Sequence, residues 1–261
     1  MAKKEAAKTE SSELALTNAN AWMVPETGEK STDLAGTEDI GLDEIRLPRL
    51  GIAQGLSPQI TPDSSSYIEN LKLFDLFNDL TGTVYGRGPI HFVPCHRAVR
   101  RIEFKPREEG GGVVDLDVPA NDPRTQWTKD EAGERQPPVA TKFIEFVVLL
   151  LREGVNPEPI VLSIKDTNKW NRQAATGLSS FIKLRQDAIY GGIYTIASKS
   201  EKNDNGTFGV YVVRALGKAA PAVREMAKQF HDSLQGKTIV VDREPGSDDF
   251  EPGEADDAPP M

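Results

Sequence analysis

Residues 166–190, DTNKWNRQAATGLSSFIKLRQDAIY, decide which fold the sequence predicts. Asp166 or Thr167 is suited to be the N-cap of a helix. Gly177 costs about 1 kcal/mol relative to Ala, so we expect this helix to depend on tertiary packing. Apolar residues recur at helical spacing through the stretch: Trp170, Ala174, Leu178, Phe181 and Ile182.

Strand patterns flank this predicted helix on both sides. Runs rich in β-branched and aromatic residues are typical of strands, and Pro94 indicates a bulge or an edge position. Residues 191–217 read as two strands joined by a polar loop, which predicts a hairpin. Three strands are predicted before the helix, from the runs 83–86 with 89–104, 143–151 and 159–164.

A second helix follows the hairpin. Pro221 stands near its first position and Gly236 is placed to end it. Residues 237–242, KTIVVD, predict a last short strand. The apolar stripe of the helix is Val223, Met226, Phe230 and Leu234.

This order of elements predicts a mixed β/α fold with a mainly antiparallel sheet. A helix between the third and fourth strands is the arrangement of the OB-fold, a partly open five-stranded barrel that binds oligonucleotides. We therefore expect an OB-like barrel with an extra C-terminal helix. Other α+β folds share this order and stay open as alternatives.

The remaining segments of the centre are less regular. Residues 45–60 are apolar but broken by Pro and Gly, which predicts an extended arm packed on the domain. Residues 67–80 have Leu73, Leu76, Phe77 and Leu80 at a spacing that predicts a short helix. Residues 105–140 form a long insertion rich in Gly, Pro and Asp, and loops of that length are usually functional or disordered.

Charge divides the chain into three parts. The net charge is −9 in total, −4 over residues 1–41 and −7 over residues 242–261, which leaves +2 for residues 42–241. We expect a disordered N-terminal segment (1–41), an OB-like nucleic-acid-binding domain (42–241) and a disordered acidic tail (242–261). A mildly basic centre can present a cationic face to nucleic acid, although acidic ends also serve solubility alone.

The cellular compartment is predicted from three absences. The chain begins with a polar stretch and has no apolar run of about 20 residues, so neither a secretory signal nor a membrane span is expected. The single cysteine, Cys95, cannot form an intramolecular disulfide and suits a reducing cytosol. We expect a cytoplasmic protein.

The strongest candidate for binding DNA is the basic stretch HRAVRRIEFKPR. On a strand, Arg97, Arg101 and Lys105 share one face, whereas Arg100 shares the other with Phe104. A charged edge strand that resists aggregation is the structural alternative. The candidate residues in this stretch are Arg97, Arg100, Arg101, Phe104, Lys105 and Arg107.

Two further groups combine aromatic rings with cations. Non-specific single-strand binding needs cations for the phosphates and rings on which bases stack. Trp170 is either such a ring or a core residue, and we expect Tyr194 and Tyr211 to be exposed because a hydroxyl tolerates water. The first group is Lys169, Trp170, Arg172, Lys183 and Arg185, and the second is Tyr194, Lys199, Lys202 and Tyr211.

Catalytic and metal-binding patterns are weak. His91, Cys95 and His96 lie close together, but there is no second cysteine to complete a closed zinc site. Cys95 and His96 are adjacent on a predicted strand and would point to opposite faces, which disfavours a nucleophile–base pair. We predict no enzyme activity, no metal and no cofactor.

Several stretches together resemble a phage-encoded single-stranded-DNA-binding protein. They are LPRLGIAQGLSPQI, RRIEFKPREEGGG, SIKDTNKWNRQAATGLSSFIKLR and IYTIASK with FGVYVV, followed by the acidic C-terminus. The resemblance covers residues 45–216 and the tail. It implies an OB-fold core and a tail that docks replication or recombination proteins. Such tails usually end in an aromatic residue, whereas this chain ends DDAPPM with Phe250 inside the tail.

We therefore expect a non-enzymatic protein that coats and protects single-stranded DNA during phage replication or recombination. Its binding would be independent of sequence, and the host cytoplasm would be its compartment. The main alternative is a structural or scaffold-interaction protein of a phage. An auxiliary nuclease or recombination factor is a second alternative, and it would need a carboxylate cluster for metal.

Overall fold

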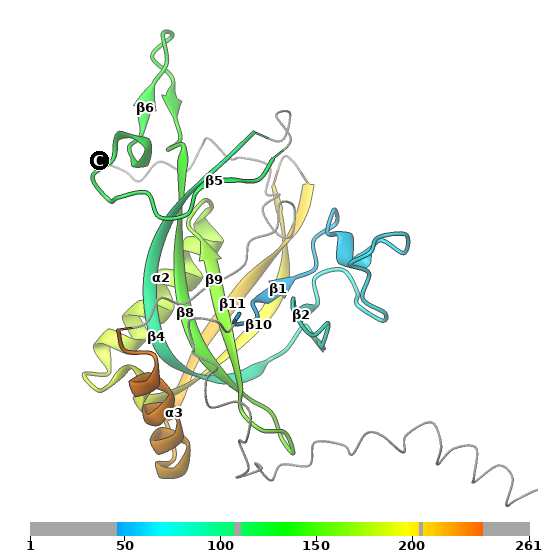
Figure 1. Ribbon diagram of the computed structural model, residues 1–261, viewed down its shortest axis with the longest axis vertical. Coiled ribbons are helices and arrows are strands. Elements are labelled where there is room, and N and C mark those ends of the chain that lie inside the picture. The colour runs from blue at the N-terminus through cyan, green and yellow to red at the C-terminus, as the bar shows by residue number, and fades with distance from the viewer. Residues whose placement is uncertain (1–45, 107–110, 204–205, 237–261) are drawn as a thin grey trace, which may run out of the picture.

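The computed structural model describes residues 46–106, 111–203 and 206–236 (Figure 1). The segments predicted to be disordered, 1–41 and 242–261, lie outside the described residues. The predicted strand 237–242 and Arg107 lie outside them as well.

A six-stranded antiparallel sheet forms the centre of the molecule (Figure 1). Its path is β11-β10-β4-β8-β9, and the short β5 pairs with the far end of β4. The predicted long strands and hairpin are confirmed, and a bulge lies between Pro94 and His96 as expected. The strands are β4 (Ile90–Phe104), β5 (Val113–Asp115), β8 (Ala140–Leu151), β9 (Glu158–Lys165), β10 (Gly192–Asn203) and β11 (Gly206–Lys218).

Two helices pack on this sheet, and the sequence predicts both of them. Helix α2 (Lys169–Leu184) lies between β9 and β10 in the chain, and α3 (Pro221–Ser233) follows β11. The N-cap of α2 is Asn168, whose side chain accepts a hydrogen bond from the Asn171 N–H at 2.8 Å. The expected N-cap at Asp166 or Thr167 is therefore wrong, because Asn168 has the extended backbone that capping requires.

The central strands bury side chains on both faces. The inner face, which α2 covers, carries a cluster that includes Phe92, Phe146 and Leu178. The outer face carries a second cluster, in which Val93 and Val147 pack with α3. The fold is thus mixed, mostly antiparallel and built on one sheet with a helix on each face. Within the described residues β9 and β11 are not paired, so the sheet is not a closed barrel.

The predicted helix over residues 67–80 is wrong. The segment forms turns that lead into strand β2 (Leu76–Asn78), which pairs with β1 (Leu50–Ile52) and β3 (Val84–Gly86). Phe74 has a φ of 69°, which no right-handed helix allows. The Asp75 carboxylate accepts a hydrogen bond from the Lys72 N–H at 3.2 Å, a local bond that competes with helix formation.

The predicted extended arm is confirmed and contacts both edge strands of the main sheet. On one side, the Val161 N–H of β9 donates to the Pro48 carbonyl at 2.8 Å. On the other side, the Gln54 amide accepts from the Gly209 N–H at 2.8 Å and donates to the Gly209 carbonyl at 3.0 Å. Leu50 and Ile52 between these contacts are only 2% and 4% exposed. The arm therefore fills the gap that separates β9 from β11.

Gly209 allows the arm to approach β11 this closely. A Cβ atom at this position would lie 2.6 Å from Ile52 Cγ2 and 3.0 Å from Phe74 Cδ1. Both neighbours are buried core residues, so neither can move away without disturbing the core. Close packing of arm and strand therefore requires glycine here.

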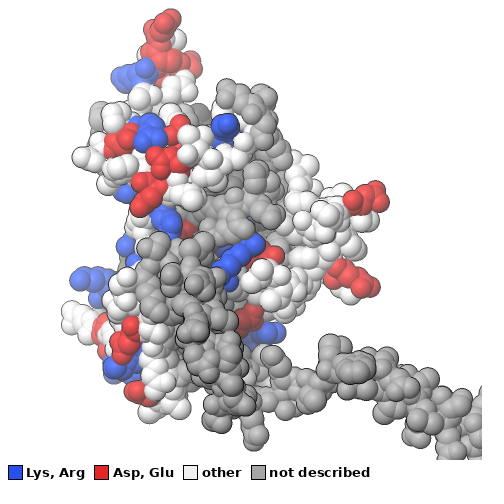
Figure 2. Space-filling model, in the orientation of Figure 1, with Lys and Arg blue, Asp and Glu red and all other residues white. Residues whose placement is uncertain are grey.

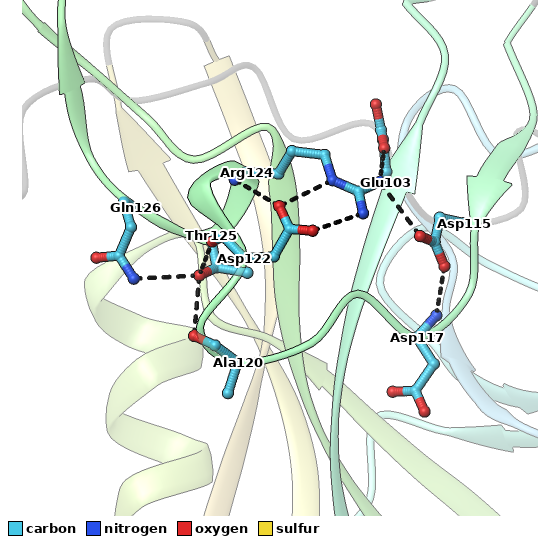
Figure 3. A network of polar contacts seen from close by, with 8 residues as sticks. All are labelled: Glu103, Asp115, Asp117, Ala120, Asp122, Arg124, Thr125 and Gln126. Carbon is cyan, nitrogen blue, oxygen red and sulfur yellow. Dashed lines mark hydrogen bonds and ion pairs between the residues drawn. The ribbon is translucent and has the colours of Figure 1, made fainter.

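The part of the long insertion that the structure describes, residues 111–139, is folded, and one arginine holds it. It contains β5, a 3₁₀ turn (Pro123–Thr125) and a hairpin of β6 (Thr128–Lys129) and β7 (Arg135–Gln136), which projects from the body (Figure 1). Arg124 bonds to Asp122 at 2.8 Å, to Asp115 at 3.2 Å and to Glu103 of β4 at 2.6 Å (Figure 3). Hydrogen bonds from Arg124 lower the pKa of Asp122 to about 2.

We predict that Gly209→Ala destabilises the protein, because the new methyl group overlaps the arm. Overpacking of this kind typically costs about 1–3 kcal/mol, measurable as a lower midpoint of urea unfolding. Gly217→Ala in the same strand is the matched control, since a Cβ there meets no atom within 4 Å. Equal midpoints for the two variants would show that the arm does not constrain Gly209.

We predict that Arg124→Met detaches the insertion without unfolding the sheet. Amide exchange should quicken in residues 113–126 and stay slow in β8, whereas Arg135→Met in the exposed hairpin should leave both unchanged. The depressed pKa means that the Asp122 contribution is present above about pH 4, the ordinary range of an aspartate, and is lost as the pH falls through about 2. Carboxyl NMR of Asp122 should give a midpoint near pH 2 in the wild type and a higher one in Arg124→Met.

Candidate nucleic-acid interface

The alternation of β4 divides its arginines between two faces, as the sequence predicts. Arg97 stands opposite the inner-face residue Phe146, and Arg101 stands opposite Lys142. Arg100 stands opposite Phe143 and points to the other side. Opposed residues of an antiparallel pair project on the same side of the sheet. Arg97, Arg101 and Lys142 therefore share the inner face with α2.

Arg97 and Arg101 keep their charge available on this face. Arg97 is exposed, and its guanidinium carbon lies 5.9 Å from the centre of the Phe146 ring. Its Nε lies 3.4 Å from the Ser179 hydroxyl of α2. Neither arginine forms an ion pair with any carboxylate in the part of the chain that the structure describes. Glu103 is the nearest acid along β4, and it is bonded to Arg124 instead.

Asp166 brings two more cations to the same place. Its carboxylate accepts from Lys142 Nζ at 2.9 Å and from Arg172 Nε at 2.8 Å. The Asp166 N–H also donates to the Lys142 carbonyl at 2.8 Å, which fixes the carboxylate beside β8. The Asp166 side chain is 12% exposed, whereas those of Lys142 and Arg172 are 43% and 34% exposed. The largely buried Asp166 carboxylate thus holds Lys142 and Arg172 side by side, and both of these cations remain accessible to solvent.

Sequence reasoning missed Lys142. It lies before the apolar run of β8 and has no basic neighbour in sequence. Its position opposite Arg101 and its bond to Asp166 connect it to the candidate site. That register depends on how the long insertion between β4 and β8 folds, and no local pattern reveals it.

The start of α2 adds an aromatic ring to these cations. Trp170 is partly buried, and its ring makes an edge-to-face contact with Phe208 of β11 at a centroid distance of 5.3 Å. Lys169 Nζ lies over the Trp170 ring, 4.4 Å from its centre. The N-terminus of a helix also carries partial positive charge. We call Arg97, Arg101, Lys142, Arg172 and Lys169 the cationic band.

Two candidate lysines lie in the hairpin that Phe208 belongs to. Lys202 is exposed and stands opposite Thr207, next to Phe208 in the register. Lys199 is exposed but forms an ion pair with Glu201. Lys202 forms no ion pair within the described residues, but it projects from the face of the hairpin opposite to Phe208 and so does not extend the site at Trp170.

The other basic candidates take part in structural contacts or lie apart. Arg100 forms an ion pair with the buried Glu145 at 3.0 Å, and Phe104 packs on Phe143 at a centroid distance of 6.0 Å. Arg185 donates to the Gly217 carbonyl and holds the end of α2 against β11. Lys105 is exposed beyond the end of β4, and Lys183 is exposed in the last turn of α2, away from Trp170.

The expected exposure of the two tyrosines is not found. Tyr194 is 0% exposed and its ring packs on Phe92, 5.7 Å away, because β10 pairs with the centre of the sheet at this position. Tyr211 is partly buried, and its hydroxyl donates to the Leu50 carbonyl of the arm at 2.5 Å. Both rings are packing residues. Phe208 is 6% exposed, as expected of a core ring.

Charge is unevenly distributed over the surface. Figure 2 shows Asp and Glu side chains gathered at the projecting end over β6, and several Lys and Arg side chains along the side where Figure 1 places α2 and β4.

Burial shifts the pKa values of both Cys95 and His96. Burial raises the pKa of the Cys95 thiol to about 12, so the thiol is protonated at neutral pH. Burial and the charge of His231 lower the pKa of His96. No group of three metal-ligating side chains occurs among residues 46–106, 111–203 and 206–236. Neither described helix is long and apolar enough to cross a bilayer.

Comparison with known proteins gives a family and no closer relative. No curated protein and no solved structure matches the chain. One family model matches residues 16–240, which include every described strand and helix. The protein belongs to the Pam3 phage gp34-like protein family.

Proposed function

We propose that the protein binds single-stranded DNA on the cationic band and coats it during phage replication or recombination. The observation that carries this proposal is the meeting of Arg97 and Arg101 of β4 with Lys142 of β8 and Arg172 of α2. These four cations come from three elements and have one carboxylate, Asp166, among them. A row of accessible cations suits a phosphate backbone, which supplies most of the affinity in sequence-independent binding.

The order of the strands supports an OB-like barrel. Numbered from β4 without the short strands of the insertion, the sheet runs 5-4-1-2-3, and α2 follows the third strand. This is the strand order expected of a five-stranded, partly open OB barrel. In such a barrel the third and fifth strands close the sheet. Here the arm that contains β1 stands between them, with Arg49 bridged to β9 on one side and Gln54 bonded to β11 on the other.

A structural or scaffold-interaction protein of a phage remains the alternative. In that case the basic residues only protect β4 and hold α2, as Arg100 and Arg185 do. The proposed role of the acidic tail, residues 242–261, is to contact replication or recombination proteins. A location in the host cytoplasm is part of the same proposal.

We predict that Arg97→Ala, Arg101→Ala and Lys142→Ala together weaken binding to oligo(dT). The slope of log affinity against log salt should fall by about 0.7 for each phosphate that the protein no longer neutralises, or about 2 for three phosphates. Fluorescence titration of a labelled oligo(dT) at several salt concentrations measures both effects.

The matched control replaces three exposed lysines elsewhere, Lys72, Lys218 and Lys228, by Ala. This control changes the net charge equally but leaves the cationic band intact, so its salt slope should stay near that of the wild type. Equal reductions of affinity in the two triple variants would mean that only overall charge matters. A wild-type protein that binds no oligo(dT) at low salt would favour the scaffold function.

A further inference from the structure

Trp170 is a partly buried aromatic ring, and Lys169 covers one of its faces. Lys169 Nζ lies 4.4 Å from the ring centre, within the range of a cation–π contact. The ring meets Phe208 edge-on, with an angle of 70° between the two planes. Phe208 is buried, so that side is closed by the core. A flat ligand that stacks on the face of Trp170 that Lys169 covers must take the place of the Lys169 ammonium.

We propose that Lys169 guards Trp170 and exchanges places with a nucleobase, which makes this pair the part of the site that selects unpaired strands. In the free protein the ammonium covers the ring. In the complex a base stacks on Trp170 and the ammonium moves to the neighbouring phosphate. This inference rests on the proposed function, because the cationic band brings the strand to the ring.

The relative strengths of the two contacts favour this exchange. An exposed cation–π contact is worth about as much as a weak hydrogen bond, whereas a stacked base contributes more and is independent of sequence. The ammonium still has a partner after it moves, since a single strand presents a phosphate beside each base. Lys169 is exposed on a flexible four-carbon side chain, so it can move while the helix backbone stays fixed.

Selection of unpaired strands follows from what a duplex can present. The bases of a duplex are stacked on one another, and unstacking one costs free energy that a single strand does not lose. A duplex would therefore contact the cationic band through phosphates but leave Lys169 on the ring. Arg172 lies two residues after Trp170 in the first turn of α2, where the two side chains point to different sides of the helix, so phosphate contact and stacking would occur on different nucleotides of one strand.

The test compares oligo(dT) with an abasic oligomer of equal length, using the full chain. The wild type should bind oligo(dT) more tightly by on the order of 5- to 150-fold, the factor that corresponds to about 1–3 kcal/mol for one stacked base. Trp170→Leu, which keeps an apolar contact for Phe208, should bring this ratio close to one. Trp127→Leu is the matched control, because that ring lies in the β6–β7 region under Arg135 and should leave the ratio unchanged.

Lys169→Met tests the movement of the ammonium separately. This variant keeps the length of the side chain without its charge, so the salt slope for oligo(dT) should fall by about 0.7, the value for one phosphate that is no longer neutralised. The preference for oligo(dT) over the abasic oligomer should remain. An unchanged slope would mean that Lys169 does not reach a phosphate, and the exchange would be wrong.

The outcomes separate this inference from the proposed function. If oligo(dT) and the abasic oligomer bind the wild type equally and with a steep salt slope, the guarded ring is wrong and binding by the cationic band stands. If Trp170→Leu keeps the full preference, stacking occurs elsewhere and the inference is overturned. If neither oligomer binds at low salt, the proposed function itself fails.

Discussion

The paired hydrogen bonds between the Gln54 amide and the Gly209 backbone connect the first described segment to the last strand of the sheet. An amide side chain offers a donor and an acceptor in the spacing that a neighbouring strand would offer, so Gln54 satisfies an edge that has no strand beside it. Gly209 must lack a side chain for Ile52 and Phe74 to reach this edge. Through this contact the arm covers Tyr211 and completes the inner core. The position of β11, and with it the support for Trp170, depends on the same contact.

A second constraint acts on strand β4, whose alternating side chains must pack into two different hydrophobic clusters, one on each face of the sheet. Near its start, Phe92 and Val93 are both buried, one on each face. Farther along, α2 and α3 leave part of the strand uncovered, and the apolar pairs give way to Arg97, Arg100 and Arg101. The same alternation that separates two hydrophobic clusters therefore separates an accessible pair of arginines from one that is bonded to Glu145. The candidate site therefore results from the alternation of side chains along β4, the same alternation that separates the two hydrophobic clusters.

Much of the fold could be predicted from the sequence because its strongest patterns are local. The apolar stripe of α2, the proline and glycine that bound α3 and the β-branched runs of β8 and β9 each act within one element. The failures have a common cause, which is tertiary context. The helical spacing of Leu73, Leu76 and Phe77 is misleading because these residues meet different neighbours after the turn at Phe74. The burial of Tyr194 could not be predicted because a strand's own sequence does not say which of its neighbours will cover a ring.

The part of the candidate site that consists of residues close together in the sequence could be predicted. Arg97, Arg101, Lys169, Trp170 and Arg172 are identified from clusters along the chain, and the structure places the four cations in one band. Lys142 and the role of Asp166 required the register of β8 and the position of the α2 N-terminus. The alternation of side chains along a strand predicts which face of the sheet an arginine occupies. It does not predict whether a carboxylate from another strand lies close enough to pair with that arginine. Arg100 and Arg101 are neighbours with different environments for that reason.

The arm also has a consequence for the order in which the chain can assemble during synthesis. Residues 47–54 leave the ribosome early, yet Gln54 bonds to a residue 155 positions later and Leu50 to one 161 positions later. Until β11 has been made, the apolar arm can pair with β2 and β9 but lacks its third partner strand, and no local contact can substitute for it. Contacts of such long range slow folding, because the chain between them must be ordered first. The earliest part of the domain to be synthesised is therefore among the last to reach its native place.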